Sequence, residues 1–297
     1  MLRSLHPMPA LGSTVALVLL AACAPDASTS PNAFQPGSAA TNRAGYDIPG
    51  THRQYGPPVK VGDGMARTYV VLDAKSGQRP VELGFALDAS VLEGLPTDAA
   101  EHSFILRLPT QAPEPYRFAE LDWNPQGHPP AGVYTVPHFD FHFYVIPQSA
   151  VDAIVPSDPE FAAKARNLPT DGYVPPGYLV PGDPAQQAVP MMGVHWFDSS
   201  APELQNLFGN PAGYQPFTRT FIYGSWDGQF TFYEPMVTLA YLQSNPDVTA
   251  PISVASLYAQ AGWYPTAYRV SYDAQAKTYY VALTGLAERV ATPPAAD

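Results

Sequence analysis

The segment 138–144 carries the residues of this chain that are best suited to chemistry. Its sequence is His-Phe-Asp-Phe-His-Phe-Tyr. Because successive side chains of a β-strand point to opposite faces, His138, Asp140 and His142 share one face and the three phenylalanines share the other. Imidazole and carboxylate groups are ligands for divalent ions such as zinc and iron. The pattern therefore predicts a divalent-metal site on one face of a strand and a hydrophobic core on the other.

The spacing of this row limits how it can bind one ion. Residues two apart on a strand are separated by about 6.6 Å, and residues four apart by about 13 Å. His138 and His142 therefore do not readily share an ion on a regular strand. Three arrangements stay open: Asp140 pairs with one of the two, a β-bulge brings them together, or Asp140 orients one imidazole without binding the ion.

Further ligands must come from other parts of the chain. His195 lies in an apolar stretch, Val194-His195-Trp196, and is the best donor. Glu234 follows it as an acid inside an aromatic strand. His128, on a loop rich in Gly and Pro, is a mobile ligand or a general base. The predicted metal ligands are thus His138, His142, His195, Asp140 and Glu234, with His128 as the predicted base.

Two functions are compatible with this set. A bound ion that activates water would make the protein a metal-dependent hydrolase. The same row can instead be a buried polar network that bonds neighbouring strands, in a non-catalytic binding protein or an oligomeric scaffold. The sequence leaves open whether the protein is an enzyme, because it holds no phosphate-binding Gly loop, no Gly-x-Ser-x-Gly turn and no His-Glu-x-x-His helix.

Alternating apolar and polar residues predict that strands position these side chains. The predicted strands cover residues 68–72, 81–87, 104–108, 116–123, 132–146, 217–223, 229–242, 266–272 and 278–284. Turns are predicted at 75–78 and at Asp227-Gly228. We expect a mainly β fold, an antiparallel sandwich or barrel-like body that forms one domain over residues 46–297.

Helices are predicted to be few, one or two and short. Residues 157–167 begin with Ser157 and Glu160 at the spacing of a capping box. Residues 148–154 could add one or two turns. The segment 169–190 is rich in Pro and Gly and is predicted to be a long loop.

Composition excludes several classes of protein. The chain of 297 residues has 35 Pro and 22 Gly, which leaves no room for a coiled coil or a helical repeat array. The hydrophobic content of 46% and the aromatic content of 12% argue against disorder throughout. The net charge of −11 argues against nucleic acid as a partner and disfavours anionic substrates.

The N-terminus is predicted to be a targeting segment. Arg3 is followed by the apolar stretch 11–20, which ends in Leu20-Ala21-Ala22-Cys23. This ending resembles the lipobox of bacterial lipoproteins, in which the cysteine is acylated and becomes the new N-terminus. The resemblance implies a signal peptide over 1–22, lipidation of Cys23 and a lipid-anchored place in the cell envelope, facing the periplasm or the exterior. Residues 23–45 are predicted to be a flexible tether, being rich in small and polar residues.

A second resemblance covers most of the chain after the tether. The residues Gly127-His128-Pro129-Pro130-Ala131-Gly132-Val133-Tyr134, followed by 137–144, resemble the signature of an uncharacterised family of exported bacterial proteins. The likeness continues through 59–96, 194–196 and 231–238. It implies a β-rich fold and homo-oligomeric rings. No established activity accompanies it, so it implies no reaction.

Overall fold

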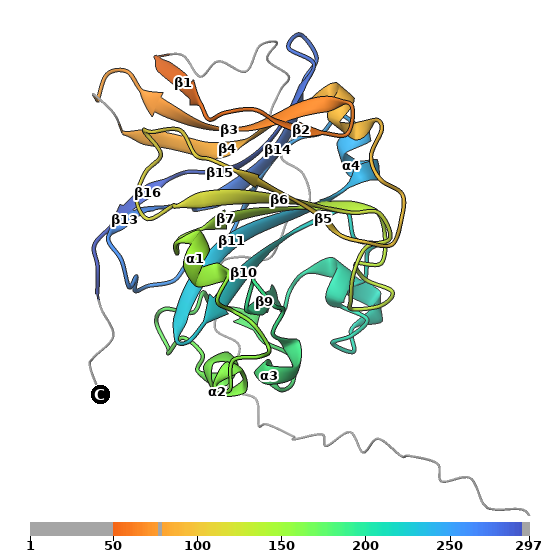
Figure 1. The fold of residues 1–297 in the computed structure, drawn as a ribbon, viewed down its shortest axis with the longest axis vertical. Helices are drawn as coiled ribbons and strands as arrows, with labels where there is room; N and C mark the ends of the chain where they lie inside the picture. The colour runs from red at the N-terminus through yellow and green to blue at the C-terminus, as the bar shows by residue number, and fades with distance from the viewer. Residues whose placement is uncertain (1–49, 77–78, 293–297) are drawn as a thin grey trace, which may run out of the picture. The chain divides into compact units, whose positions relative to one another are not determined.

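The computed structural model describes residues 50–76 and 79–292, all within one compact unit. The predicted signal peptide, the lipidation of Cys23 and the tether 23–45 lie outside the described residues. The described part is built mainly from antiparallel strands that pack as a sandwich of two sheets (Figure 1). Within it, the helices are too short or too polar to cross a membrane.

The first sheet contains seven strands. Their order is β1 (Thr51–Tyr55), β3 (Gly64–Asp73), β4 (Pro80–Asp88), β15 (Thr278–Thr284), β14 (Ala267–Asp273) and β12 (Asp247–Pro251), with β2 (Val59–Val61) paired to β3. The hairpins β3–β4 and β14–β15 were predicted from alternation, and both are confirmed.

The second sheet also contains seven strands. Their order is β5 (His102–Leu106), β6 (Phe118–Asn124), β7 (His138–Tyr144), β11 (Gln229–Thr238), β10 (Arg219–Trp226), β9 (Val194–Asp198) and β8 (Tyr178–Leu179). A separate pair consists of β13 (Gly262–Tyr264) and β16 (Ala287–Arg289). In Figure 1, the strands of the first sheet lie above those of the second.

The core lies between the two sheets and receives the apolar face of β7. Phe139, Phe141 and Phe143 are fully buried in it, as their alternation predicted. The ring of Phe85 from the first sheet meets those of Phe141 and Phe143 edge to face, at centroid distances of 5.2 and 5.0 Å. Because these phenylalanines fix the orientation of β7, the polar residues between them must point to the opposite side of the second sheet.

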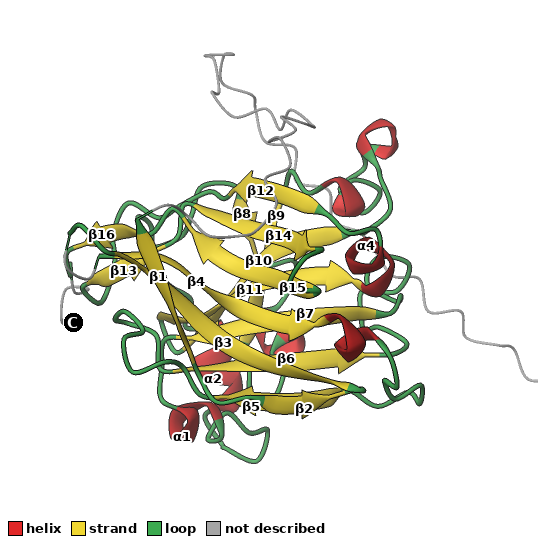
Figure 2. Ribbon diagram, turned by 90° about the horizontal axis from the view of Figure 1, so that it is seen from above, coloured by secondary structure: helices red, strands yellow, loops and turns green. Residues whose placement is uncertain are grey.

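Short helices occupy the connections. They are α1 (Gln148–Val151), α2 (Phe161–Arg166), α3 (Pro184–Gln187), α4 (Leu239–Gln243) and the single 3-10 turns η1 (Ala89–Leu92), η2 (Pro202–Leu204) and η3 (Pro211–Gly213). In Figure 1, α2 and α3 lie below the second sheet, on the side away from the first. Figure 2, seen from above, shows the strands of the two sheets crossing one another.

Several predicted boundaries are wrong. The strand predicted over 132–146 begins at His138, because residues 131–133 form a turn. The strand predicted over 229–242 ends at Thr238, whose hydroxyl accepts a hydrogen bond from the backbone N–H of Tyr241 and caps α4. The predicted helix 157–167 begins only at Phe161, and Ser157 does not cap it. The predicted loop 169–190 contains β8 and α3.

Candidate metal centre

The polar face of β7 lies on the outer side of the second sheet, and it is buried. Across β6, Asp122 pairs with Asp140 and Asn124 pairs with His138. His138, Asp140 and His142 are all at most 2% exposed. Two small apolar clusters, formed with residues that lie outside the main core, cover this side of the sheet. The row is thus a set of polar groups enclosed between the sheet and the segments that cross it.

The first group of potential ligands consists of His128, His138 and Asp140, and we call it the His128 group. Nε2 of His138 lies 3.2 Å from Oδ1 of Asp140. Nε2 of His128 lies 3.3 Å from Oδ2 of the same carboxylate. Two ligands of one ion, each about 2.0–2.2 Å from it, are themselves about 3–3.5 Å apart. The three groups are therefore spaced as ligands of a shared ion would be.

The second group consists of His142, His195 and Glu234, and we call it the His142 group. Nε2 of His142 lies 3.5 Å from Oε2 of Glu234, and Nε2 of His195 lies 3.8 Å from the same oxygen. Each group thus offers two imidazoles and one carboxylate. This combination occurs in catalytic zinc sites and in non-haem iron(II) sites, where it leaves a coordination position for water or substrate.

The second ring nitrogen of each histidine also has a partner. Nδ1 of His138 lies 2.7 Å from the carbonyl oxygen of Val136, and Nδ1 of His128 lies 2.8 Å from that of Pro129. An Nδ1–H that donates to a carbonyl leaves the lone pair on Nε2, which here faces Asp140.

In the His142 group, the second ring nitrogen of His142 faces a carboxylate rather than a carbonyl, and it is among the buried atoms that form no hydrogen bond. Nδ1 of His142 lies 2.9 Å from Oδ2 of Asp122. His195 has a hydrogen bond to the backbone of Gly193. Histidines that bind metals almost always have such a partner on the ring nitrogen away from the metal, because it sets the tautomer and the ring orientation.

Three carboxylates of this region, those of Asp122, Asp140 and Glu234, are buried without a permanent cation. In the part of the chain that the structure describes, no Lys or Arg forms an ion pair with any of them. Asp140 accepts one hydrogen bond, from Nδ2 of Asn124 at 2.8 Å. Among the buried atoms with no hydrogen bond are His138 Nε2, Asp140 Oδ1, His142 Nε2 and Glu234 Oε2. Buried polar atoms are normally satisfied, so these atoms point to a missing partner.

Charge and burial oppose each other at these side chains. Burial by itself lowers the pKa of His142, but the carboxylates of Glu234 and Asp122 raise it to about 10. Burial also opposes a raised pKa at His128, where Asp140 nevertheless raises the pKa to about 9. Burial raises the pKa of Glu234 to about 8, although His142 opposes this. The region therefore favours added positive charge, whether it comes from protons or from a cation.

His195 differs from the other imidazoles. Burial lowers its pKa to about 3, and the positive charges of His142 and His128 act in the same direction. A histidine that stays neutral at physiological pH keeps a lone pair available for a metal.

Two glycines allow the backbone to place these histidines. Gly127 has φ of 68°, and a Cβ there would collide with the backbone of Thr135, at 2.8 Å from its Cα. This turn presents His128 from the loop after β6. Gly224 on β10 pairs with His195, and a Cβ at that position would overlap the ring of Phe232. Only glycine leaves room there for the close approach of the two strands.

The structure divides the predicted ligands between the two groups. His138 is with Asp140, whereas His142 is with His195 and Glu234, so the pairing of Asp140 with one of the two β7 histidines is the arrangement seen. β7 has no bulge that brings His138 and His142 together. His128 lies within the first group as a potential ligand.

Sequence reasoning missed two residues of the adjacent strand. Asp122 faces His142, and Asn124 holds Asp140. Their signal was present in the alternation Leu121-Asp122-Trp123-Asn124, which places both polar side chains on the face opposite Leu121 and Trp123.

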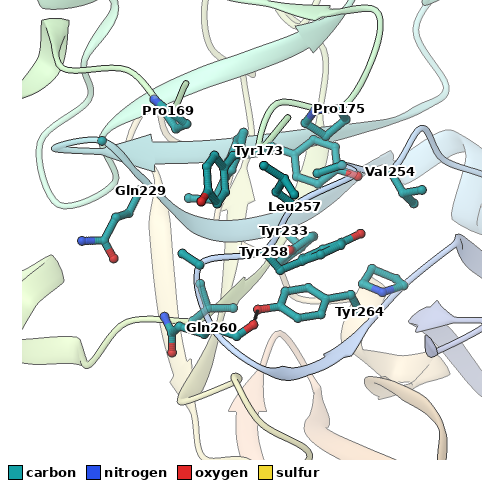
Figure 3. Close-up of a pocket in the computed structure, with 17 residues that line it drawn as sticks. Pro169, Tyr173, Pro175, Gln229, Tyr233, Val254, Leu257, Tyr258, Gln260 and Tyr264 are labelled. Atoms are coloured by element: carbon teal, nitrogen blue, oxygen red, sulfur yellow. Dashed lines mark hydrogen bonds between the residues drawn. The ribbon is translucent and has the colours of Figure 1, made fainter. Parts of the chain in front are cut away.

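A separate cavity of about 50 Å³ is shown in Figure 3. Its lining includes several tyrosines and prolines, among them Tyr173, Pro175, Tyr233, Tyr258 and Tyr264. None of its lining residues belongs to the His128 group or the His142 group. It is therefore not part of the candidate metal centre.

Comparisons of the chain with protein-family models, with curated proteins and with solved structures find no match. The resemblance to a family of exported bacterial proteins therefore stays a prediction, and the site has to be interpreted from its own geometry.

Proposed function

We propose that this chain is a lipid-anchored envelope protein that binds divalent metal, zinc or iron, through His128, His138, Asp140, His142, His195 and Glu234. The observation that carries the proposal is the orientation of the four histidines. Each Nε2 faces a buried carboxylate oxygen at 3.2–3.8 Å, while Nδ1 of His128 and of His138 is hydrogen-bonded to a backbone carbonyl and Nδ1 of His142 lies 2.9 Å from Asp122. A protein that only needed a neutral core would not retain carboxylates without permanent cations at this depth.

The chemistry that such an ion would supply is activation of water, which makes a metal-dependent hydrolase the proposed reaction class. Two imidazoles and one carboxylate leave a coordination position for the water. The carboxylates of Asp140 and Glu234 would balance the positive charge of the ion. The carbonyl of Val136 would orient the imidazole of His138, and the carboxylate of Asp122 would orient that of His142. The lipid anchor at Cys23 and assembly into a homo-oligomer belong to the same proposal and rest on the N-terminal sequence and on the family resemblance.

Elemental analysis of the full chain, purified without a histidine tag and without chelator, tests this proposal. The comparison variant is His138→Ala/His142→Ala, which removes one ligand from each group. The matched control is His102→Ala, since His102 lies in a surface pair with Asp98 away from both groups. We expect near-stoichiometric zinc or iron in the wild type and in the control, and none in the double variant, with circular dichroism unchanged.

The absence of metal from the wild type, combined with unfolding or dissociation of the double variant, would overturn the proposal. It would leave a histidine network that stabilises a non-catalytic scaffold.

A further inference from the structure

We infer that the His128 group and the His142 group are two separate ion sites, of which the first exchanges its ion with solvent and the second is closed. The inference rests on the proposed function, since it requires that the chain binds metal.

Each group has its own three potential ligands, and the two groups do not overlap. Each has two imidazole Nε2 atoms and one carboxylate, and no side chain belongs to both sets. Asp140 and His142 are neighbours on the same face of β7, about 6.6 Å apart along the strand. Asp140 is turned toward the loop that carries His128, whereas His142 is turned toward β11 and β9. The two sets therefore diverge from one strand.

Each group also has its own apolar surroundings. The His138 ring meets Phe217 at a centroid distance of 5.5 Å, and the His128 ring meets Tyr134 at 5.9 Å. Both aromatic residues belong to one small cluster on the outer face of the second sheet.

The His142 group contacts the other cluster. The His142 and His195 rings meet Phe232 at 4.7 and 5.3 Å. Phe232 packs in a cluster with Tyr144 and Val151 that shares no residue with the first. Each group thus has its own apolar surroundings, and such a shell controls water access and the local dielectric of a metal site.

Access to solvent distinguishes the two sites. The His128 side chain is 32% exposed and comes from a loop, so the ion that it binds can be reached by water. The His142 group is more enclosed, with side-chain exposures of 1%, 2% and 16% for His142, Glu234 and His195. Asp122, with no exposure, lies behind His142. The His128 site is therefore the one where water activation and substrate access are expected.

Two measurements on the full chain test the inference. The first counts bound zinc in the wild type, in His128→Gln and in Glu234→Gln, with His102→Gln as the matched control. The second follows release of zinc to an excess of a chromophoric chelator. We expect two zinc ions in the wild type and the control, one in each group variant, and two release phases whose rates differ at least tenfold. The fast phase should be missing from His128→Gln, and the slow phase from Glu234→Gln.

The outcomes separate the two proposals. A wild type without zinc overturns the proposed function. A wild type with one zinc, which both group variants lose, leaves the proposed function intact and overturns the division into two sites. Two ions whose fast phase disappears in Glu234→Gln overturn the assignment of the open site.

Titration of the ion-depleted wild type with Co²⁺ gives a count that does not depend on the folding of any variant. Two equivalents support the inference, and one equivalent overturns it.

Discussion

The outer faces of the two sheets bury carboxylates in opposite ways. On the first sheet, Glu82 accepts a hydrogen bond from the hydroxyl of Tyr69. The guanidinium of Arg53 lies over the rings of Tyr69 and Tyr280, at 4.9 and 4.6 Å from their centroids, and donates to the Tyr280 hydroxyl. This face therefore carries a phenolic donor for its buried acid and, over the ring of the same tyrosine, a permanent cation.

The outer face of the second sheet has no such permanent cation. Asp122, Asp140 and Glu234 face imidazoles, whose charge depends on pH. A buried charge without a partner destabilises the folded state, so the buried carboxylates on both faces need nearby positive charge or hydrogen-bond donors. The buried carboxylate of the first face is therefore stabilised by groups that are always present in the folded protein. The buried carboxylates of the second face are balanced by positive charge that protons or ions can supply and remove. Such a face suits the binding of an ion.

The largest expected effect is that of metal on stability. Free Zn²⁺ at about 1,000 times its dissociation constant should raise the free energy of unfolding by about 4 kcal/mol for each site that it fills, because it binds the folded state. The same Zn²⁺ concentration should raise the free energy of unfolding of Glu82→Gln, a variant of the first sheet, by the same amount. Denaturant unfolding with and without Zn²⁺ measures this, and an equal gain in His138→Ala/His142→Ala would place the stabilising ion elsewhere.

The second effect is the pH dependence of the ion-depleted protein. The pKa of His142 is about 10 in the folded state and about 6.5 unfolded. Its imidazolium therefore stabilises the fold fully below pH 6.5, and this contribution is lost as pH rises toward 10. Glu234, with a pKa of about 8, acts in the same direction above its ordinary value of 4.5.

Linkage limits this loss to about 1.4 kcal/mol per pH unit for each proton released. Denaturant unfolding between pH 6.5 and 10 measures it. A flat profile without metal would show that the imidazoles do not compensate the buried carboxylates. Saturation with Zn²⁺ should reduce the slope, because the ion replaces the protons.

The third effect concerns the permanent cation of the first sheet. Arg53→Met should lower the free energy of unfolding by about 1–3 kcal/mol, since it removes a donor and a charge from a half-buried site. The loss should be the same with and without Zn²⁺. In a double-mutant cycle, Glu82→Gln should reduce the cost of Arg53→Met. A cost that changes with Zn²⁺ would contradict the independence of the two faces.

The smallest effect is expected from the amide that holds Asp140. Asn124→Ala should weaken zinc binding at the His128 group about tenfold, because Asp140 loses its hydrogen bond while every ligand is retained. Competition with a chelator measures the affinity, with Gln126→Ala, two residues beyond the end of β6, as control. Equal affinities in the two variants would show that Asn124 does not position Asp140.

The strands of the fold could be predicted from local pattern because the core imposes period 2 on them. Alternation in 138–144 was enough to separate the phenylalanines from the polar row. The ends of elements were harder, as at Thr238, where apolar residues continue to Leu242 but the hydroxyl caps a helix. The packing of a neighbouring element decides such an end.

The ligand types, the face of β7 that bears them and the mainly β fold could be predicted from the order of residues alone, because these follow from residue chemistry and strand geometry. Only the tertiary structure decided that Asp140 belongs with His128 and His138, and that His142 belongs with His195 and Glu234. The partners come from a loop and from strands distant in sequence, and strand order, register and the loop turn at Gly127 set which of them meet. No local pattern carries that information, since pairing between distant segments is fixed by the packing of the whole sheet.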